Sequence, residues 1–252
     1  MKTTKVISIA AALFFLLGGV KAFGAGEDVY LKKSPNYKRL SAKVIRKVPL
    51  PEGYHEGLFY DGEAMWVANG DGGKIWIVDM ASGAVRTMIE PISNFAEALT
   101  RSGDETYFAT EWFDKKIYTA RVNGNRLEAD SSSSVAPNFP AGVVWTGSRL
   151  YVITWQRGLG TKFYLLEMDK DMSVKRKISI DKIQEPSQLA WDGNNLWITS
   201  WYDSMVYKVD IDKMEIVGAF HFPAPKATGI AWDGKYMWLV GTYSDLYQLE
   251  II

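Results

Sequence analysis

Two glutamates stand out as possible acid and base groups, because they occupy the same place in a repeated sequence unit. Glu56 and Glu97 each directly precede the small residue that opens a unit, and later units carry Ala141, Ser187 and Thr228 at this place. Two carboxyl groups that lie close together can have their pKa values driven apart, which suits general acid and base catalysis. We therefore take Glu97 and Glu56 as candidate catalytic residues. The alternative is that both are hydrogen-bonded structural groups.

A second series of candidates consists of aromatic and polar residues that follow the second predicted strand of most units. Aromatic side chains with interleaved hydroxyl and amide groups are typical of a wall around a small ligand. Ordinary packing between units is the alternative, because it also uses aromatic residues. Together with polar residues near the first series, the ligand-binding candidates are Trp112, Trp155, Trp201, Tyr243, Ser187, Gln188, Thr228, Thr242 and Asn69.

Other chemistries have little support in the sequence. The chain contains 2 His and no Cys, which disfavours a zinc site, and it has no Gly-x-Ser-x-Gly nucleophile motif. We expect no metal and no cofactor. Lys and Arg together number 29, as do Asp and Glu, so the basic excess of a nucleic-acid-binding protein is missing.

The candidates are positioned by a unit that recurs five times along the chain. Its opening residues lie 41 to 46 positions apart, with a glycine five positions later and an aromatic residue nine positions later. Units of this length, made of short strands and tight turns, are typical of propeller blades. The sequence predicts an all-β, five-bladed β-propeller of four-stranded blades. The opening residues are Gly57, Ala98, Gly142, Gln188 and Gly229.

The two ends of the chain predict how the propeller closes. The fifth unit stops at Ile252 after its third strand, and residues 42–50 can supply the missing fourth strand. Closure by an N-terminal strand that completes the last blade removes a free sheet edge. We expect a propeller at residues 42–252 and an exposed leader at residues 25–41. The polar segment Arg126–Ser134 predicts a short or frayed outer strand in the second blade.

Residues 1–24 have the pattern of a secretory signal peptide. Lys2 and Lys5 precede an apolar stretch at residues 6–20, and small residues follow it. An uncleaved N-terminal anchor is the alternative. We expect an exported protein, periplasmic or secreted, that is monomeric and has no membrane span after removal of the signal.

Three stretches resemble the glutamine cyclotransferase (glutaminyl-peptide cyclotransferase) family of five-bladed propellers. Residues 54–58 are similar to the family's Phe-Thr-Gln-Gly-Leu, residues 95–100 to its Phe-Gly-Glu-Gly-Leu-Thr, and residues 228–233 to its Asn-Gly-Ile-Ala-Trp-Asp. These enzymes convert N-terminal glutamine to pyroglutamate with loss of ammonia. The resemblance implies that Glu97 moves a proton from the attacking amine to the leaving ammonia. It also implies that Trp112 and Trp201 line the pocket.

Several family positions are altered in this chain. Thr242 stands where the family has a site lysine, Ser187 where it has an asparagine, and Ala141 where it has a tryptophan. The family's first-blade glutamate has no clear counterpart near Asn69. Such losses weaken substrate fixation and charge stabilisation.

We therefore expect a divergent, non-catalytic propeller that binds a small molecule or a peptide N-terminus at an aromatic and carboxylate-lined channel mouth. The alternative is an active glutaminyl-peptide cyclotransferase with Glu97 as general acid and base. A protein-interaction platform has less support, because the sequence has no large apolar surface run. A calcium-dependent lactonase would need Asn and Asp on the innermost strands of the second and third blades, where the sequence does not supply them.

Overall fold

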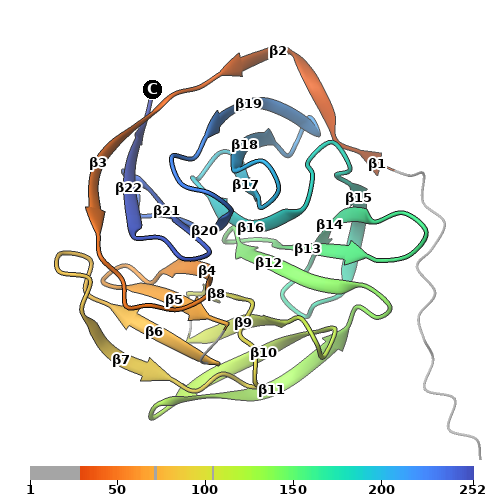
Figure 1. Cartoon of the computed structure of the whole chain (residues 1–252). Helices are drawn as coiled ribbons and strands as arrows, with labels where there is room; N and C mark the ends of the chain where they lie inside the picture. Colours follow the sequence, from red (N-terminus) through yellow and green to blue (C-terminus); the bar gives the residue numbers. More distant parts are fainter. Residues whose placement is uncertain (1–28, 71–72, 104) are drawn as a thin grey trace, which may run out of the picture.

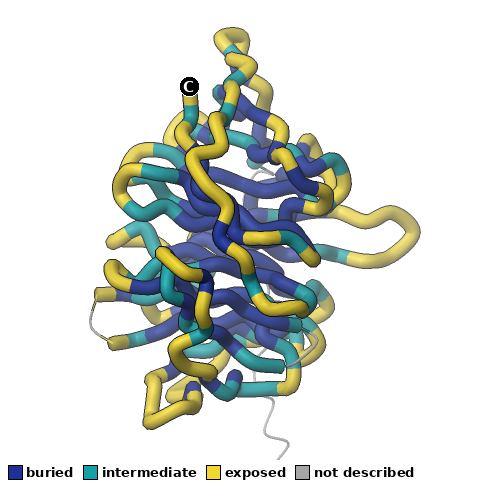
Figure 2. The backbone as a smooth tube through the Cα atoms, turned by 60° about the vertical axis from the view of Figure 1, so that its left-hand side comes forward, coloured by how far each residue is buried: buried dark blue, intermediate teal, exposed yellow. Residues whose placement is uncertain are grey.

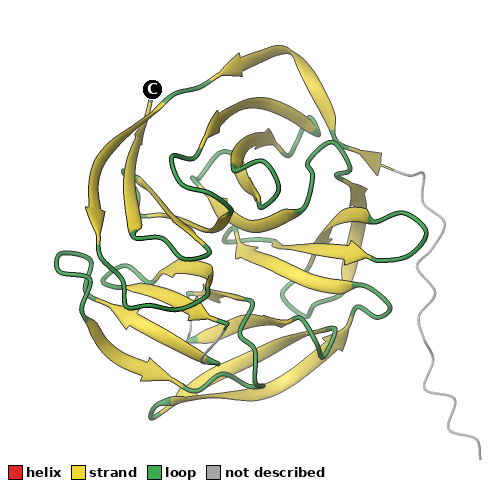
Figure 3. Cartoon of the chain, in the orientation of Figure 1, coloured by secondary structure: helices red, strands yellow, loops and turns green. Residues whose placement is uncertain are grey.

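The protein folds into five β-sheets arranged around a central axis (Figure 1). The computed structural model describes residues 29–70, 73–103 and 105–252, and these form strands, turns and loops (Figure 3). Within these ranges no helix could cross a membrane. The predicted signal peptide at residues 1–24 lies outside the described residues. The all-β, five-bladed propeller predicted from the repeats is confirmed.

Each blade is an antiparallel sheet whose first strand lies nearest the axis. Blade 1 contains β4 (His55–Tyr60), β5 (Met65–Asn69), β6 (Lys74–Val78) and β7 (Val85–Ile89). Blade 2 contains β8 (Ala98–Ser102), β9 (Thr106–Glu111), β10 (Lys116–Asn123) and β11 (Arg126–Ser134). Blade 3 contains β12 (Phe139–Trp145), β13 (Leu150–Gln156), β14 (Lys162–Met168) and β15 (Val174–Ser179). Blade 4 contains β16 (Pro186–Trp191), β17 (Leu196–Ser200), β18 (Met205–Asp210) and β19 (Glu215–His221).

Blade 5 joins the two ends of the described chain. It contains β20 (Ala227–Trp232), β21 (Met237–Gly241) and β22 (Leu246–Ile251), and its outer strand is β3 (Ala42–Val48). β3 pairs antiparallel with β22, from Ala42 opposite Ile251 to Val48 opposite Leu246. The predicted closure by an N-terminal strand is therefore present, and it covers the outer edge of β22.

The segment expected as an exposed leader takes part in the fold. β1 (Val29–Tyr30) runs parallel to β15, and β2 (Lys32–Arg39) runs parallel to β19, so blades 3 and 4 each gain a fifth strand. Leu31 between them is buried, although most of β2 is exposed. The charged, Pro-containing sequence of β2 lacks the alternation of a core strand, and this composition is typical of a protected sheet edge. The prediction of an exposed leader up to residue 41 is therefore wrong for residues 29–41, which include the paired strands β1 and β2.

The outer strand of blade 2 is longer than the sequence predicted. β11 spans 9 residues and pairs with β10 over its whole length, with one bulge near Thr119. Most of the side chains of β11 are exposed, so polar residues are suited to this outermost strand. The Thr119 and Ser131 hydroxyls lie 2.6 Å apart across the two strands. The prediction of a short or frayed strand was wrong, because an outermost strand needs no apolar face.

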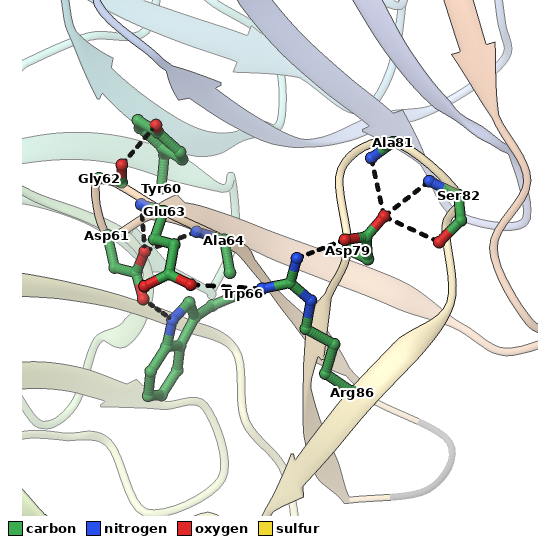
Figure 4. A network of polar contacts seen from close by, with 10 residues as sticks. All are labelled: Tyr60, Asp61, Gly62, Glu63, Ala64, Trp66, Asp79, Ala81, Ser82 and Arg86. Carbon is green, nitrogen blue, oxygen red and sulfur yellow. Dashed lines mark hydrogen bonds and ion pairs between the residues drawn. The ribbon is translucent and has the colours of Figure 1, made fainter.

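A repeated turn explains the Asp-Gly and Trp periodicity of the sequence. In blade 1, Asp61 Oδ1 accepts hydrogen bonds from the backbone of Glu63 and Ala64, and Asp61 Oδ2 accepts one from Trp66 Nε1 at 2.7 Å (Figure 4). Gly62 in this turn has a φ of 104°, which favours glycine. The same carboxylate–indole bond recurs in two further blades, as Asp192–Trp197 and Asp233–Trp238.

Apolar side chains fill the spaces between neighbouring blades. Between blades 1 and 5, for example, Val67 and Trp76 pack with Trp238 and Leu246. Figure 2 shows that the strands are buried through the middle of the molecule and that exposure concentrates in the loops. The fold therefore provides a rigid scaffold whose loops are free to carry function.

Small residues at the openings of the repeat let the innermost strands approach closely at the axis. A Cβ atom on Gly57 would lie 2.4 Å from Gln188 Nε2, and one on Gly142 would lie 2.6 Å from the Gln188 Cα. A Cβ atom on Gly229 would lie 2.4 Å from the carbonyl oxygen of Glu56. These distances leave no room for a side chain, so the glycines are required by the approach of neighbouring strands.

Candidate functional site

Bulges in four of the innermost strands lie at residues of the first candidate series. In four blades the pairing of the first and second strands shifts register at the same point. A bulge of this kind redirects a side chain and is common next to functional sites. The shifts lie between His55 and Leu58, between Pro140 and Val143, between Pro186 and Leu189, and between Ala227 and Gly229.

These residues meet the loops at one end of the channel and form a cavity of about 400 Å³, here called the mouth pocket. Six of the eleven candidates line it, namely Glu56, Glu97, Trp112, Trp155, Ser187 and Trp201. The other lining residues are Tyr54, Phe95, Phe113, Ala141, Arg157 and Glu185. The pocket size suits a small ligand or the end of a peptide.

The remaining five candidates do not line the mouth pocket. Asn69 and Tyr243 line a separate cavity between blades 1 and 5. Gln188 is buried, and its Oε1 accepts hydrogen bonds from the backbone of Val143 and Leu189 at 3.0 and 2.8 Å.

Thr228 and Thr242 are also buried. Thr228 Oγ1 donates to the Val240 carbonyl at 3.3 Å. The hydrogen bonds of Gln188 and Thr228 therefore connect neighbouring strands.

Glu97, which lines the pocket, interacts electrostatically with the buried carboxyl group of Glu111. Glu111, the last residue of β9, is 1% exposed, and the Ser93 hydroxyl donates to its Oε2. Burial raises the pKa of Glu111 to about 8. Burial also raises the pKa of Glu97, and the nearby charge of Glu111 raises it further. A carboxyl group that retains its proton near neutral pH can donate and later recover it.

Glu111 was missing from the candidates, although a signal was present in the sequence. It is a carboxylate inside a strand that is otherwise apolar or neutral, and it directly precedes Trp112 of the aromatic series. A carboxylate in such a strand is rarely buried without a partner or a function. Its relation to Glu97 depends on contact between neighbouring strands, β8 and β9, which spacing alone does not give.

Tyr54 brings a hydroxyl group to the same region. Burial and the charges of Glu56 and Glu97 raise the pKa of Tyr54 to about 12, so its hydroxyl stays protonated. The nearby indole of Trp201 lowers this pKa slightly, against the larger effects that raise it. Tyr54 therefore offers a neutral hydrogen-bonding group beside the carboxylates.

The tryptophans of the mouth pocket pack against neighbouring residues and also line the pocket. Trp112 and Trp155 meet edge to face with centroids 5.4 Å apart, and Trp155 Nε1 donates to the Pro186 carbonyl at 2.7 Å. Arg157 lies over Trp112, with its Cζ atom 5.2 Å from the ring centroid. Packing and exposure to the pocket thus coexist, and the fixed indoles form a preorganised wall.

Glu185 has an unusual backbone at the pocket edge. Its φ is 44°, a left-handed conformation that is disfavoured for a residue before proline. The Trp201 backbone N–H donates to its carbonyl oxygen at 2.9 Å, and its Oε2 atom is buried without a hydrogen-bond partner. Strain and an unsatisfied carboxylate oxygen often accompany functional positions. Sequence reasoning missed this residue, because backbone strain leaves no pattern in the sequence.

The charge of the mouth pocket is predominantly acidic. Glu56, Glu97 and Glu185 line it, and Arg157 is the cationic residue among its twelve lining residues. Within the described ranges there is no cluster of three or more His, Asp or Glu residues that could hold a metal ion. The arrangement can bind a positively charged or hydrogen-bond-donating group and can exchange protons with it.

Comparisons with known proteins bear on the fold. No family model matches the chain, and no curated protein matches it. Among solved structures, glutaminyl cyclase from Myxococcus xanthus has a TM-score of 0.70 and 16% identity, covering 85% of this chain and 98% of that one. The PQQ-bound aldose sugar dehydrogenase from Streptomyces coelicolor has a TM-score of 0.59 and 13% identity, covering 85% and 99%. At these identities the likeness shows that the chain shares the propeller fold of these enzymes.

Proposed function

We propose that the mouth pocket binds the amino terminus of a peptide or a small amine. The observation that carries this proposal is the excess of carboxylates in an aromatic pocket. A bound ammonium group would pair with Glu185 and Glu56 in this pocket.

Exposed apolar residues around the mouth favour a peptide over a free amine. The loops that join the second and third strands of blades 2 to 5 each carry one large exposed side chain. Such residues on the same rim are typical of a contact surface for a longer ligand. They are Phe113 (71% exposed), Leu159 (115%), Tyr202 (66%) and Tyr243 (72%).

A second candidate function is cyclisation of N-terminal glutamine, favoured by the raised pKa of Glu97 and by the fold shared with a glutaminyl cyclase. In this reaction the α-amine attacks the side-chain amide carbon, the C–N bond to the amide nitrogen breaks, and ammonia leaves. Glu97, which starts protonated, would give its proton to the departing nitrogen and recover the proton that the amine loses. Arg157 is the lining cation that could stabilise the oxyanion in place of the family's lysine.

One experiment separates binding from catalysis. Glutaminyl peptides with free and acetylated amino termini are titrated into the mature protein by calorimetry, and ammonia release is measured in parallel. We expect the free amino terminus to bind at least tenfold more tightly, a difference of about 1.4 kcal/mol. Equal affinities would refute recognition of the amino terminus.

Glu97→Gln serves as the catalytic control. Ammonia release that disappears in this variant while binding persists would support cyclisation. If both proteins bind the peptide and neither releases ammonia, the binding function is supported and cyclisation is refuted. An exported location and a monomeric state remain part of the proposal.

A further inference from the structure

The N-terminal strands give one side of the propeller a strongly basic edge. Residues 29–48, here called the basic rim, contain seven lysine or arginine residues and no aspartate or glutamate. Because the whole chain has 29 residues of each sign, the rest of it carries a matching acidic excess. Figure 1 shows β1, β2 and β3 of the rim following the outer edge of blades 3, 4 and 5. The basic residues are Lys32, Lys33, Lys38, Arg39, Lys43, Arg46 and Lys47.

The basic residues of the rim are exposed and lack counter-charges. Glu215 and Glu250 are the strand partners of Lys32 and Lys43. Nevertheless, none of the seven cations forms an ion pair in the part of the chain that the structure describes. Charges on an outer strand prevent pairing with another sheet, and either sign would serve that purpose. The exclusive use of cations therefore favours an anionic partner.

Aliphatic side chains are exposed among these cations. Val44 and Ile45 are 38% and 39% exposed, because a bulge in the pairing of β3 with β22 leaves Ile45 without a strand partner. Ile252 is exposed as well, and two backbone hydrogen bonds hold it beside Ser41 at the start of β3. A surface that mixes basic and aliphatic groups suits an anionic bilayer, where cations meet lipid phosphates and aliphatic groups enter the acyl boundary.

The order of the chain brings an apolar stretch close to the rim. Residues 6–20 are mostly apolar and come shortly before β1, the first strand of the rim. An apolar segment and a basic cluster together supply the two signals that stable attachment to a bilayer takes. On export, the apolar segment would bring the rim to a membrane. After its removal, the rim alone would give reversible, salt-dependent attachment.

We propose that the basic rim docks the propeller on the surface of an anionic lipid bilayer. Its lysine and arginine side chains donate hydrogen bonds to the lipid phosphates, and Val44 and Ile45 contact the acyl boundary. No residue of the rim lines the mouth pocket, so a docked protein keeps that pocket open. The docking surface is thus independent of the ligand proposed for the mouth pocket.

Vesicle sedimentation tests the docking surface. The protein without residues 1–24, which keeps all five blades, is mixed with vesicles of phosphatidylcholine and phosphatidylglycerol or with vesicles of phosphatidylcholine alone. We expect partitioning to the anionic vesicles to be at least about tenfold stronger at low salt. It should fall steeply towards 1 M salt, where the screening length is about 3 Å. Equal partitioning to the two kinds of vesicle would overturn the proposal.

A charge-matched pair of variants locates the surface. The triple variant Lys38→Gln, Arg39→Gln, Lys43→Gln should bind anionic vesicles at least about tenfold more weakly, because each basic residue near such a surface contributes up to about fivefold. The control Arg126→Gln, Lys162→Gln, Lys182→Gln removes three exposed cations outside the rim and should bind like the wild type.

The same loss of binding in both variants would refute the rim as the docking surface. Urea unfolding of each variant shows whether the fold is kept. Binding of double-stranded DNA that is as tight as vesicle binding, at equal phosphate concentration and salt, would overturn the assignment of a lipid partner. A Val44→Ser, Ile45→Ser variant keeps the charge of the rim and should still weaken vesicle binding, since it removes the aliphatic contact.

Discussion

Burial of Glu111 predicts that a Glu111→Gln variant gains stability over the wild type as the pH rises. Burial raises the pKa of Glu111 to about 8, from an ordinary value of 4.5. A group whose folded-state pKa is raised contributes stability that is fully present below its unfolded pKa. This contribution is lost as the pH rises through the folded value. Glutamine cannot ionise, so the variant loses no stability from this position as the pH rises through that range.

The size of the effect follows from the linkage between proton binding and folding. While the folded state holds the proton and the unfolded state does not, the wild type loses about 1.4 kcal/mol per pH unit. From about pH 5.5 to about pH 7.5 the stability difference should therefore widen by roughly 1–3 kcal/mol, the upper figure being the full linkage value. At acid pH both proteins should be equally stable, because the amide oxygen can still accept the hydrogen bond from Ser93.

Urea unfolding followed by tryptophan fluorescence measures the difference at a series of pH values. Glu128→Gln is the control, since Glu128 is exposed on β11 and should give a difference that is independent of pH. A Glu111→Gln difference that is equally flat would refute the reasoning, as it would mean that Glu111 ionises normally in the folded protein. A difference that narrows with rising pH would refute it as well.

Three further predictions follow from the same structure. Glu111→Gln should lower the pKa of Glu97, because the Glu111 charge raises it, so a pH profile of ligand binding or turnover should shift towards acid. Gly57→Ala should lower the free energy of unfolding by about 2 kcal/mol in urea titrations, because its Cβ would lie 2.4 Å from Gln188 Nε2. Asp233→Ala should cost about 2 kcal/mol by the same assay, and Asp233→Asn less, because asparagine keeps the backbone cap and loses only the acceptor for Trp238.

The fold could be predicted because the repeat contains residues that a particular local backbone conformation requires. A glycine in a turn with positive φ, such as Gly234 at 97°, and the aspartate before it recur in blades 1, 4 and 5 because these blades have the same turn. The closing strand β3 could also be predicted, since it fills a gap left at the other end of the chain. β2 could not, because a charged edge strand has the composition of a loop.

The sequence predicted only some of the residues of the candidate site. Position in the repeat identified Glu56, Glu97 and Ser187, which all line the mouth pocket; a bulge in the innermost strand lies at Glu56 and at Ser187. Repeat position misplaced Tyr243, which lines the cavity between blades 1 and 5 although Trp112, at the same offset from its repeat opening, lines the mouth pocket. Glu185 lies before the repeat begins, and its backbone conformation has no sequence signature.

The start of β4 places neighbouring residues in two cavities. Tyr54 and Glu56 line the acidic mouth pocket, whereas His55 lines the cavity between blades 1 and 5. A free amine would contact only the carboxylates of the mouth pocket. A peptide with a free amino terminus would also cover the exposed rings of Phe113 and Tyr202 on the loops around the mouth. The arrangement therefore favours the polypeptide ligand proposed above over a small metabolite.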